Sequence, residues 1–117
     1  MNGELICSDL INLLEDYKAQ EVLQLSVSEM TSLFDTFFIC TGTSTRHVKT
    51  IADKIVRHFK AKMPQTPRAE GLERCEWVLI DLGDVIVHIM LAETRAFYRL
   101  EQLWTCAESE KPLSTNS

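Results

Sequence analysis

The most chemically informative part of the chain is an apolar segment that also carries a tryptophan, two aspartates and a histidine. It runs from Gly71 to Met90, and Leu82-Gly83 separates two runs of strand-forming residues. Gly83 can adopt a positive φ, which tight hairpins often need. The segment therefore predicts a β-hairpin with strands of about five to seven residues.

Alternation along this hairpin divides its side chains between two faces. Val85, Val87 and Ile89 form an aliphatic face, which we expect to be buried. The opposite side, here called the mixed face, is expected to be open and to contact a partner. Its members are Trp77, Leu79, Asp81, Asp84, Ile86, His88 and Met90. Trp77 fits two roles, a core aromatic or an interface anchor.

Carboxylates on neighbouring strands can bind Mg²⁺, so Asp81 and Asp84 are candidate metal ligands. Nucleotidyltransferases place their two carboxylates two residues apart on one strand, whereas these are three apart across a turn. Aspartates beside a Leu-Gly turn are also ordinary turn residues. We therefore expect no metal, no cofactor and no catalytic residue, with a nucleotidyltransferase-like enzyme as the alternative.

A small polar turn, Thr41–His47, is expected to connect a strand to a helix. Its backbone amides could cradle an anion, with Arg46 adding charge, but it lacks the spacing of a P-loop. A capped turn that needs small residues for close packing is the favoured interpretation. No nucleophile elbow accompanies His47, His58 or His88, so each is expected to be a surface or partner-contact residue.

The flanking sequence predicts the elements that position these residues. Amphipathic spacing predicts helices over 4–19, from Thr43 or Ser44 to before Pro64, and over 93–104. Strands are predicted at 22–27, at 35–41 and, on a sheet edge, at 67–70. The last helix is expected to turn Ala96, Phe97, Leu100, Leu103 and Trp104 toward the core. The predicted fold class is α/β, a mixed β-sheet with the helices covering one face.

Composition limits the function classes. The 117 residues suit one domain, 1–105, followed by a polar tail, 106–117, that is predicted to be disordered. The net charge of -5 disfavours broad phosphate contacts and suits a basic protein partner, so no specific nucleic acid is expected.

Four scattered cysteines indicate reduced core residues rather than a zinc site. Neither a signal peptide nor a membrane span is evident, which favours a cytoplasmic protein without a membrane partner.

Several segments together resemble the ribosomal silencing factor (RsfS or Iojap) family over about residues 4–104, with the tail outside the resemblance. They are Asp35, Ile39 to Val48, Glu70-Gly71, Trp77 to His88 and Phe97 to Trp104. The resemblance implies a nucleotidyltransferase-like fold without the catalytic carboxylates. It also implies a non-enzymatic protein that binds the large ribosomal subunit, and the lack of an evident transit peptide favours a bacterial member.

Within that family, the implied partner is the universal large-subunit ribosomal protein numbered fourteen. Binding there would sterically block joining of the small subunit and repress translation when nutrients are scarce; organellar relatives act in ribosome assembly. A homodimer of the free protein is an alternative that the sequence leaves open. The residues expected to contact the partner are Trp77, Asp81, Asp84, Ile86, His88, Met90, Arg95 and Tyr98.

Overall fold

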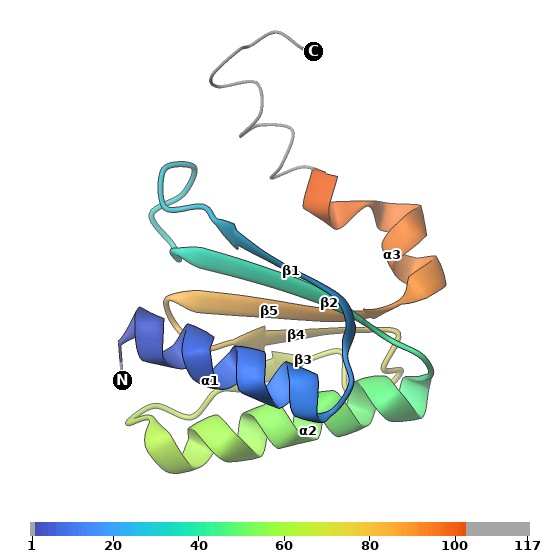
Figure 1. Cartoon of the computed structure of the whole chain (residues 1–117), viewed down its shortest axis with the longest axis horizontal. Helices are drawn as coiled ribbons and strands as arrows, with labels where there is room; N and C mark the ends of the chain where they lie inside the picture. The colour runs from blue at the N-terminus through green and yellow to red at the C-terminus, as the bar shows by residue number, and fades with distance from the viewer. Residues whose placement is uncertain (1, 103–117) are drawn as a thin grey trace, which may run out of the picture.

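A five-stranded sheet forms the centre of the protein, with helices on both of its sides in the computed structural model (Figure 1). The structure describes residues 2–102. In chain order the elements are α1 (Gly3–Asp16), β1 (Gln20–Ser26), β2 (Thr36–Gly42), α2 (Thr45–Lys62), β3 (Arg68–Glu70), β4 (Trp77–Asp81), β5 (Val85–Leu91) and α3 (Ala92–Tyr98). Within residues 2–102, no helix is both long enough and apolar enough to cross a bilayer.

The strand order is β1-β2-β5-β4-β3, and the sheet is mixed as predicted. Strands β2 and β5 are parallel, whereas the other neighbouring pairs are antiparallel. The predicted hairpin is β4–β5, with Gly83 at a φ of 91°. Asp81 Oδ1 accepts a hydrogen bond of 2.8 Å from the Gly83 amide, so this carboxylate stabilises the turn.

The aliphatic face of the sheet is buried under α1 and α2, as predicted. Val85, Val87 and Ile89 are fully buried there. Helix α2 contributes Val48, Ile51, Ala52, Ile55 and Phe59, and α1 contributes Ile6, Leu10 and Leu14. Their spacing of three and four residues places each set on one side of its helix. The two longer helices thus form one layer against one face of the sheet.

A second, smaller core lies on the opposite face of the sheet. It contains Val27, Phe37, Ile39 and Met90, and residues of the connector between β1 and β2 pack against it. Helix α3 lies on this side, away from α1 and α2 (Figure 1). The expectation that the helices cover a single face is therefore wrong for α3.

Helix α3 is also shorter than the predicted helix over 93–104. It ends at Tyr98 because Arg99 adopts a left-handed conformation, with φ 49°. Ala96 and Phe97, which precede this residue in the helix, are both exposed, Phe97 by 78%, so their predicted core positions are wrong. Leu100 does pack against the second core, whereas Leu103, Trp104 and the tail 106–117 lie outside the described residues.

The three cysteines that the structure describes are free thiols, as predicted for core residues. Cys40 and Cys75 are buried, and Cys7 is half-buried. Burial raises the pKa of the Cys40 thiol to about 12, which keeps it protonated and unreactive at neutral pH.

Candidate docking surface

The mixed face is only partly open. Its members in β4, together with Ile86 and His88, are half-buried, while Asp84 in the turn is exposed. Met90 is completely buried beside Phe37 and Ile39 in the second core. The prediction that Met90 contacts a partner is therefore wrong, because neighbouring strands and their covering segments enclose that end of the face.

Aromatic side chains join the mixed face to α3. The Trp77 indole Nε1 donates a hydrogen bond of 2.9 Å to His88 Nδ1. The Trp77 ring lies 4.9 Å from the Tyr98 ring, which in turn lies 4.9 Å from the Phe97 ring. Tyr98 is 55% exposed, so the cluster is packed at Trp77 and open to solvent at α3. Aromatic groups in such a position are the side chains that most often anchor protein interfaces.

His88 differs from the surface histidine predicted from the sequence. Burial lowers the pKa of His88 to about 4, so the imidazole is neutral at physiological pH. Its ring also lies 4.9 Å from the ring of Phe37. The neutral His88 imidazole therefore holds the Trp77 ring in place by accepting its hydrogen bond, and it also lines the mixed face.

A shallow hollow of about 280 Å³ opens on this surface. It is lined by Glu70, Gly71, Trp77, Leu79 and His88. Gly71 has a φ of 89°, and a Cβ at this position would collide with the Trp77 carbonyl oxygen. Leu79 lies on the same face as Trp77 through strand alternation, although it is not among the predicted contact residues. The hollow could accept one apolar side chain of a partner.

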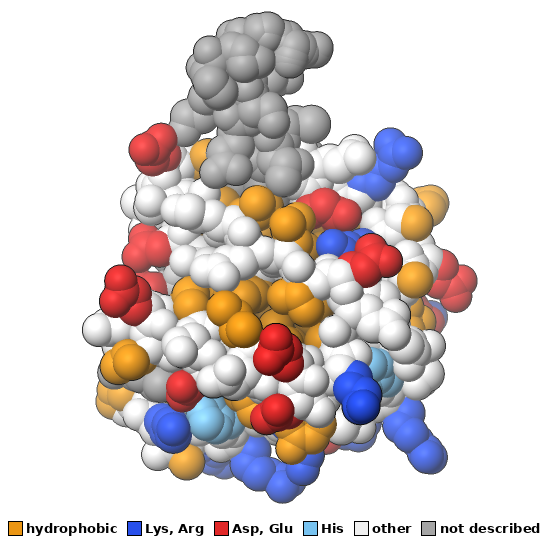
Figure 2. Space-filling view, viewed as in Figure 1, with side chains coloured by type: hydrophobic (Ala, Val, Ile, Leu, Met, Phe, Trp, Pro, Cys, Tyr) orange, Lys and Arg blue, Asp and Glu red, His pale blue; other side chains and the backbone are white. Residues whose placement is uncertain are grey.

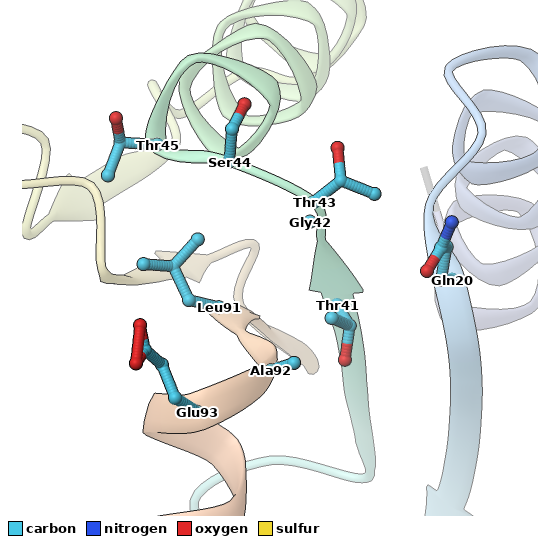
Figure 3. Close-up of a pocket in the computed structure, with 9 residues that line it drawn as sticks. All are labelled: Gln20, Thr41, Gly42, Thr43, Ser44, Thr45, Leu91, Ala92 and Glu93. Carbon is cyan, nitrogen blue, oxygen red and sulfur yellow. The ribbon is translucent and has the colours of Figure 1, made fainter.

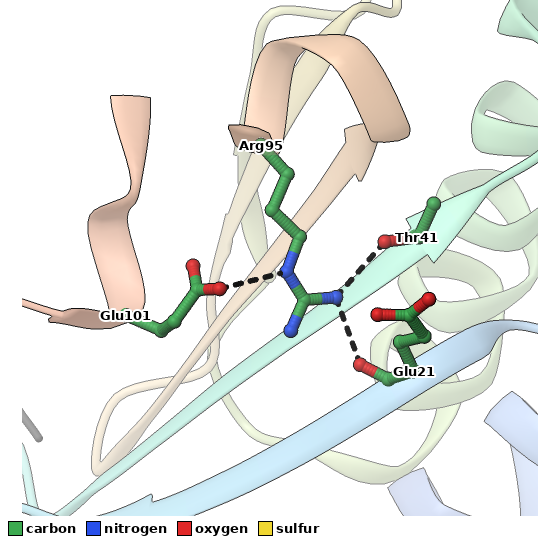
Figure 4. Close-up of polar contacts among 4 residues, drawn as sticks. All are labelled: Glu21, Thr41, Arg95 and Glu101. Carbon is green, nitrogen blue, oxygen red and sulfur yellow. Dashed lines mark hydrogen bonds and ion pairs between the residues drawn. The ribbon is translucent and has the colours of Figure 1, made fainter. Parts of the chain in front are cut away.

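Arg95 serves the fold rather than the open surface. Its side chain is 11% exposed, and Nη1 donates to the Glu21 carbonyl oxygen at 2.8 Å and to Thr41 Oγ1 at 2.9 Å (Figure 4). Its Nε donates to Glu101 Oε2 at 3.3 Å. Because these contacts occupy the guanidinium, the prediction that Arg95 contacts a partner is replaced by a role in holding α3 on the sheet.

The turn after β2 packs closely, as its small residues predicted. Ser44 caps α2, since its Oγ accepts from the His47 amide at 3.1 Å. A Cβ at position 42 would lie 2.6 Å from Val48 Cγ2, so only glycine fits. A cavity of about 570 Å³ adjoins the turn, and Glu93 stands at its α3 side (Figure 3). This carboxylate opposes binding of a phosphate there.

His47 and His58 make internal contacts. His47 Nδ1 accepts from the Thr43 amide at 2.9 Å, so Nε2 carries the proton and donates to the Tyr17 carbonyl oxygen at 2.7 Å. This bridge ties the turn to the end of α1. His58 Nε2 lies 2.9 Å from Asp9 Oδ2 and links α2 to α1. Both histidines therefore join elements of the fold, which the sequence did not predict.

Asp81 and Asp84 both accept hydrogen bonds near the hairpin turn, Asp81 through its side chain and Asp84 through its backbone carbonyl. The Asp81 carboxylate accepts from the turn, and the Asp84 carbonyl oxygen accepts from the amides of Asp35 and Thr36 at 2.8 and 3.1 Å. Across residues 2–102, no group of three or more His, Cys, Asp or Glu side chains is arranged to hold a metal ion.

The chain is similar to known proteins over most of its length. Residues 4–116 match the model for "Ribosomal silencing factor during starvation", so the similarity extends into the tail, beyond the predicted limit near residue 104. The ribosomal silencing factor of Chromobacterium violaceum is 42% identical over 94 residues, covering 80% of this chain and 77% of that protein. The corresponding factor of Halalkalibacterium halodurans is 36% identical and covers 89% of each chain.

A solved structure supports the same relationship. A crystal structure of a protein from Chromobacterium violaceum has a TM-score of 0.85 and 39% identity, covering 90% of this chain and 88% of that one. A mouse protein named for mitochondrial assembly of the ribosomal large subunit is 32% identical, over 90% of this chain and 47% of its own length. Given these matches in both sequence and structure, the chain belongs to the ribosomal silencing factor family.

Proposed function

We propose that this protein binds the large ribosomal subunit through a basic ribosomal protein, the universal protein numbered fourteen, and blocks joining of the small subunit. The result is repression of translation, above all during nutrient limitation. The family match over residues 4–116 supports the ribosomal role. The proposed site of action is the cytoplasm, where subunits join.

The observation that supports the docking surface is the open aromatic cluster on the mixed face. Trp77 and Leu79 are half-buried beside a hollow, and Phe97 and Tyr98 project from α3 into solvent. The proposed contact residues are Trp77, Leu79, Asp81, Asp84, Ile86, His88, Phe97 and Tyr98. The aspartates at the rim would face the basic groups of the partner, which favours the correct orientation at encounter.

Sedimentation of ribosomes tests the blocking mechanism. The full chain should sediment with isolated large subunits, and it should not sediment with small subunits or with joined ribosomes. Adding it before the small subunits should reduce the joined fraction in proportion to its occupancy on large subunits. Equal binding to large subunits and joined ribosomes would contradict a steric block.

The alternative is a nucleotidyltransferase-like enzyme that uses the turn after β2 with Asp81 and Asp84. We propose instead that the function needs neither nucleotide nor metal. Protein stripped with EDTA should bind the purified ribosomal protein normally in a metal-free assay, and nucleotide with Mg²⁺ should not raise its melting temperature. Loss of binding on stripping, restored by Mg²⁺, would favour the enzyme. A role in ribosome assembly and a homodimer of the free protein are further alternatives.

A further inference from the structure

The charges of this acidic protein are unevenly distributed between α2 and the rest of the chain. Helix α2 carries six of the twelve Lys and Arg residues and one acidic residue, Asp53. The rest of the chain has six basic and sixteen acidic residues. A space-filling view shows basic side chains gathered along the lower rim, over α2 (Figure 2). A net charge of -5 therefore conceals a strongly basic helix.

Four of these basic residues form a row on the outer side of α2, here called the basic stripe. The stripe consists of Arg46, Lys49, Arg57 and Lys60. Helical periodicity places them opposite the buried residues Val48, Ile55 and Phe59. At 1.5 Å per residue, the stripe extends over about 21 Å. All four side chains are exposed.

Most residues of the basic stripe make no ion pair or hydrogen bond with other described residues of the protein. Lys49 pairs with Asp53 at 3.5 Å, whereas the side chains of Arg46, Arg57 and Lys60 have no ion pair or hydrogen bond among residues 2–102. The two remaining basic residues of the helix have internal partners. Lys62 lies 3.5 Å from Asp9, and the Lys54 ammonium lies 5.7 Å from the centre of the Tyr17 ring. Among the basic residues of α2, those without an internal partner thus all belong to the stripe.

We propose that the basic stripe binds the phosphate backbone of RNA, an inference that rests on the proposed function at a ribosomal subunit. Lys and Arg side chains in a row neutralise successive phosphates and release counterions, which supplies affinity without reading sequence. This departs from the expectation that the net charge of -5 disfavours phosphate contacts, because α2 by itself carries six basic residues and one acidic residue. The acidic remainder of the protein confines the contact to α2.

A lipid surface fits the stripe less well than RNA does. Helices that lie on membranes insert an apolar face, whereas the apolar face of α2 is buried in the core. None of the large hydrophobic residues exposed among residues 2–102 lies on α2. Because α2 and the mixed face are on opposite sides of the sheet, RNA and a protein partner can bind at the same time (Figure 1).

Binding of the full chain to a fully paired RNA hairpin, free of protein, tests the stripe. The variant is Arg57→Gln with Lys60→Gln, since glutamine keeps helix propensity. The control, Lys18→Asn with Arg74→Gln, removes two exposed basic residues outside α2 and gives the same net charge. The stripe variant should bind about tenfold more weakly in low salt, with a salt slope smaller by about two. The control should stay within about twofold of the unmodified protein.

Equal losses in the two variants, or no RNA binding at low salt, would overturn the proposal. So would binding to phosphatidylserine vesicles without binding to the hairpin. The stripe variant should also bind the purified ribosomal protein with unchanged or higher affinity. If that protein is not bound by any form of the chain, the proposed docking function fails while the RNA result stands by itself.

Discussion

At the residue scale, the hydrogen bond between Trp77 and His88 on the mixed face should make the stability of the fold depend on pH. The indole N–H can only donate, so the 2.9 Å bond requires an unprotonated His88 Nδ1. Protonating the imidazole on both nitrogens removes this acceptor. The folded protein resists that change, and burial lowers the pKa of His88 to about 4 from an ordinary value of 6.5.

The stability of the protein should therefore fall as the pH is lowered from 6.5 toward 4. In this range the unfolded state binds a proton at His88 while the folded state does not, so acid favours unfolding. Urea unfolding at pH 7 and pH 4.5 measures the effect. His88→Gln can still accept from Trp77 but cannot titrate, so its loss of stability over this range should be smaller. Identical losses in the two proteins would show that another group causes the dependence.

Tyr98 is the residue that best separates binding from folding. Because 55% of its side chain is exposed, Tyr98→Ala should change the free energy of unfolding by less than about 1 kcal/mol. It should weaken binding of the ribosomal protein by about 2 kcal/mol, as loss of an interface anchor does. Leu5→Ala is the control, since Leu5 is 53% exposed but lies on α1, across the sheet. Equal effects on binding would exclude α3 from the interface.

At the element scale, α3 depends on a polar connection to the sheet. None of its residues from Ala92 to Tyr98 is buried, so it gains little from hydrophobic packing. Arg95 instead connects the helix to β1 and β2 through the Glu21 carbonyl oxygen and the Thr41 hydroxyl. Because Phe97 and Tyr98 belong to the same helix, the contacts of the Arg95 guanidinium also determine their position beside the mixed face.

Replacing Arg95 should displace α3 and weaken partner binding, although Arg95 need not touch the partner. Arg95→Gln should lower the free energy of unfolding by about 1–3 kcal/mol, because the bonded groups lose a charged donor. Binding of the ribosomal protein should fall in parallel. Arg95→Lys should recover part of both losses, since an ammonium keeps the charge without the planar fork. A fully bound Arg95→Gln protein would show that α3 finds its position by other contacts.

At the scale of the whole molecule, the protein has a basic helix on one side and an acidic remainder. The electrostatic potential is positive at α2 and negative over the rest of the protein. A basic protein and a polyanion would therefore be attracted to different surfaces, which favours one orientation of this protein between them. The two surfaces lie on opposite sides of the sheet, so the two proposed partners would not compete for the same place.

The separation of basic and acidic surfaces predicts that one double variant will bind RNA more weakly but associate faster with the basic ribosomal protein. Arg57→Gln with Lys60→Gln makes the net charge more negative, so at low salt its association with the basic ribosomal protein should be faster, by about twofold. The same change should weaken binding to RNA. Stopped-flow association at two salt concentrations measures the rate, and the difference should vanish at high salt because the charges are screened. A slower association with the ribosomal protein would mean that α2 contributes to that interface.

The sequence alone determined most of the helices and strands, and it determined which side of the hairpin and of α2 is buried. Alternation put Val85, Val87 and Ile89 on one face of the hairpin, and their aliphatic side chains made that face the buried one, since the opposite face carries polar groups. The spacing in α2 fixed its core side in the same way. The small residues at Gly42 and Ser44 predicted a close-packed, capped turn, which local sterics and hydrogen bonding require.

Only the tertiary structure decided how much of the mixed face stays open. Periodicity shows which way a side chain points, but not which distant segment lies over it. Met90 is enclosed because strand β2, the connector after β1 and Leu100 meet above it, and Arg95 is occupied because α3 crosses back over β1 and β2. Phe97 lies on the solvent side of α3, and the left-handed conformation of Arg99 ends the helix at Tyr98, so the predicted helical pattern does not continue. These outcomes depend on packing between segments far apart in the chain, for which a local pattern carries no signal.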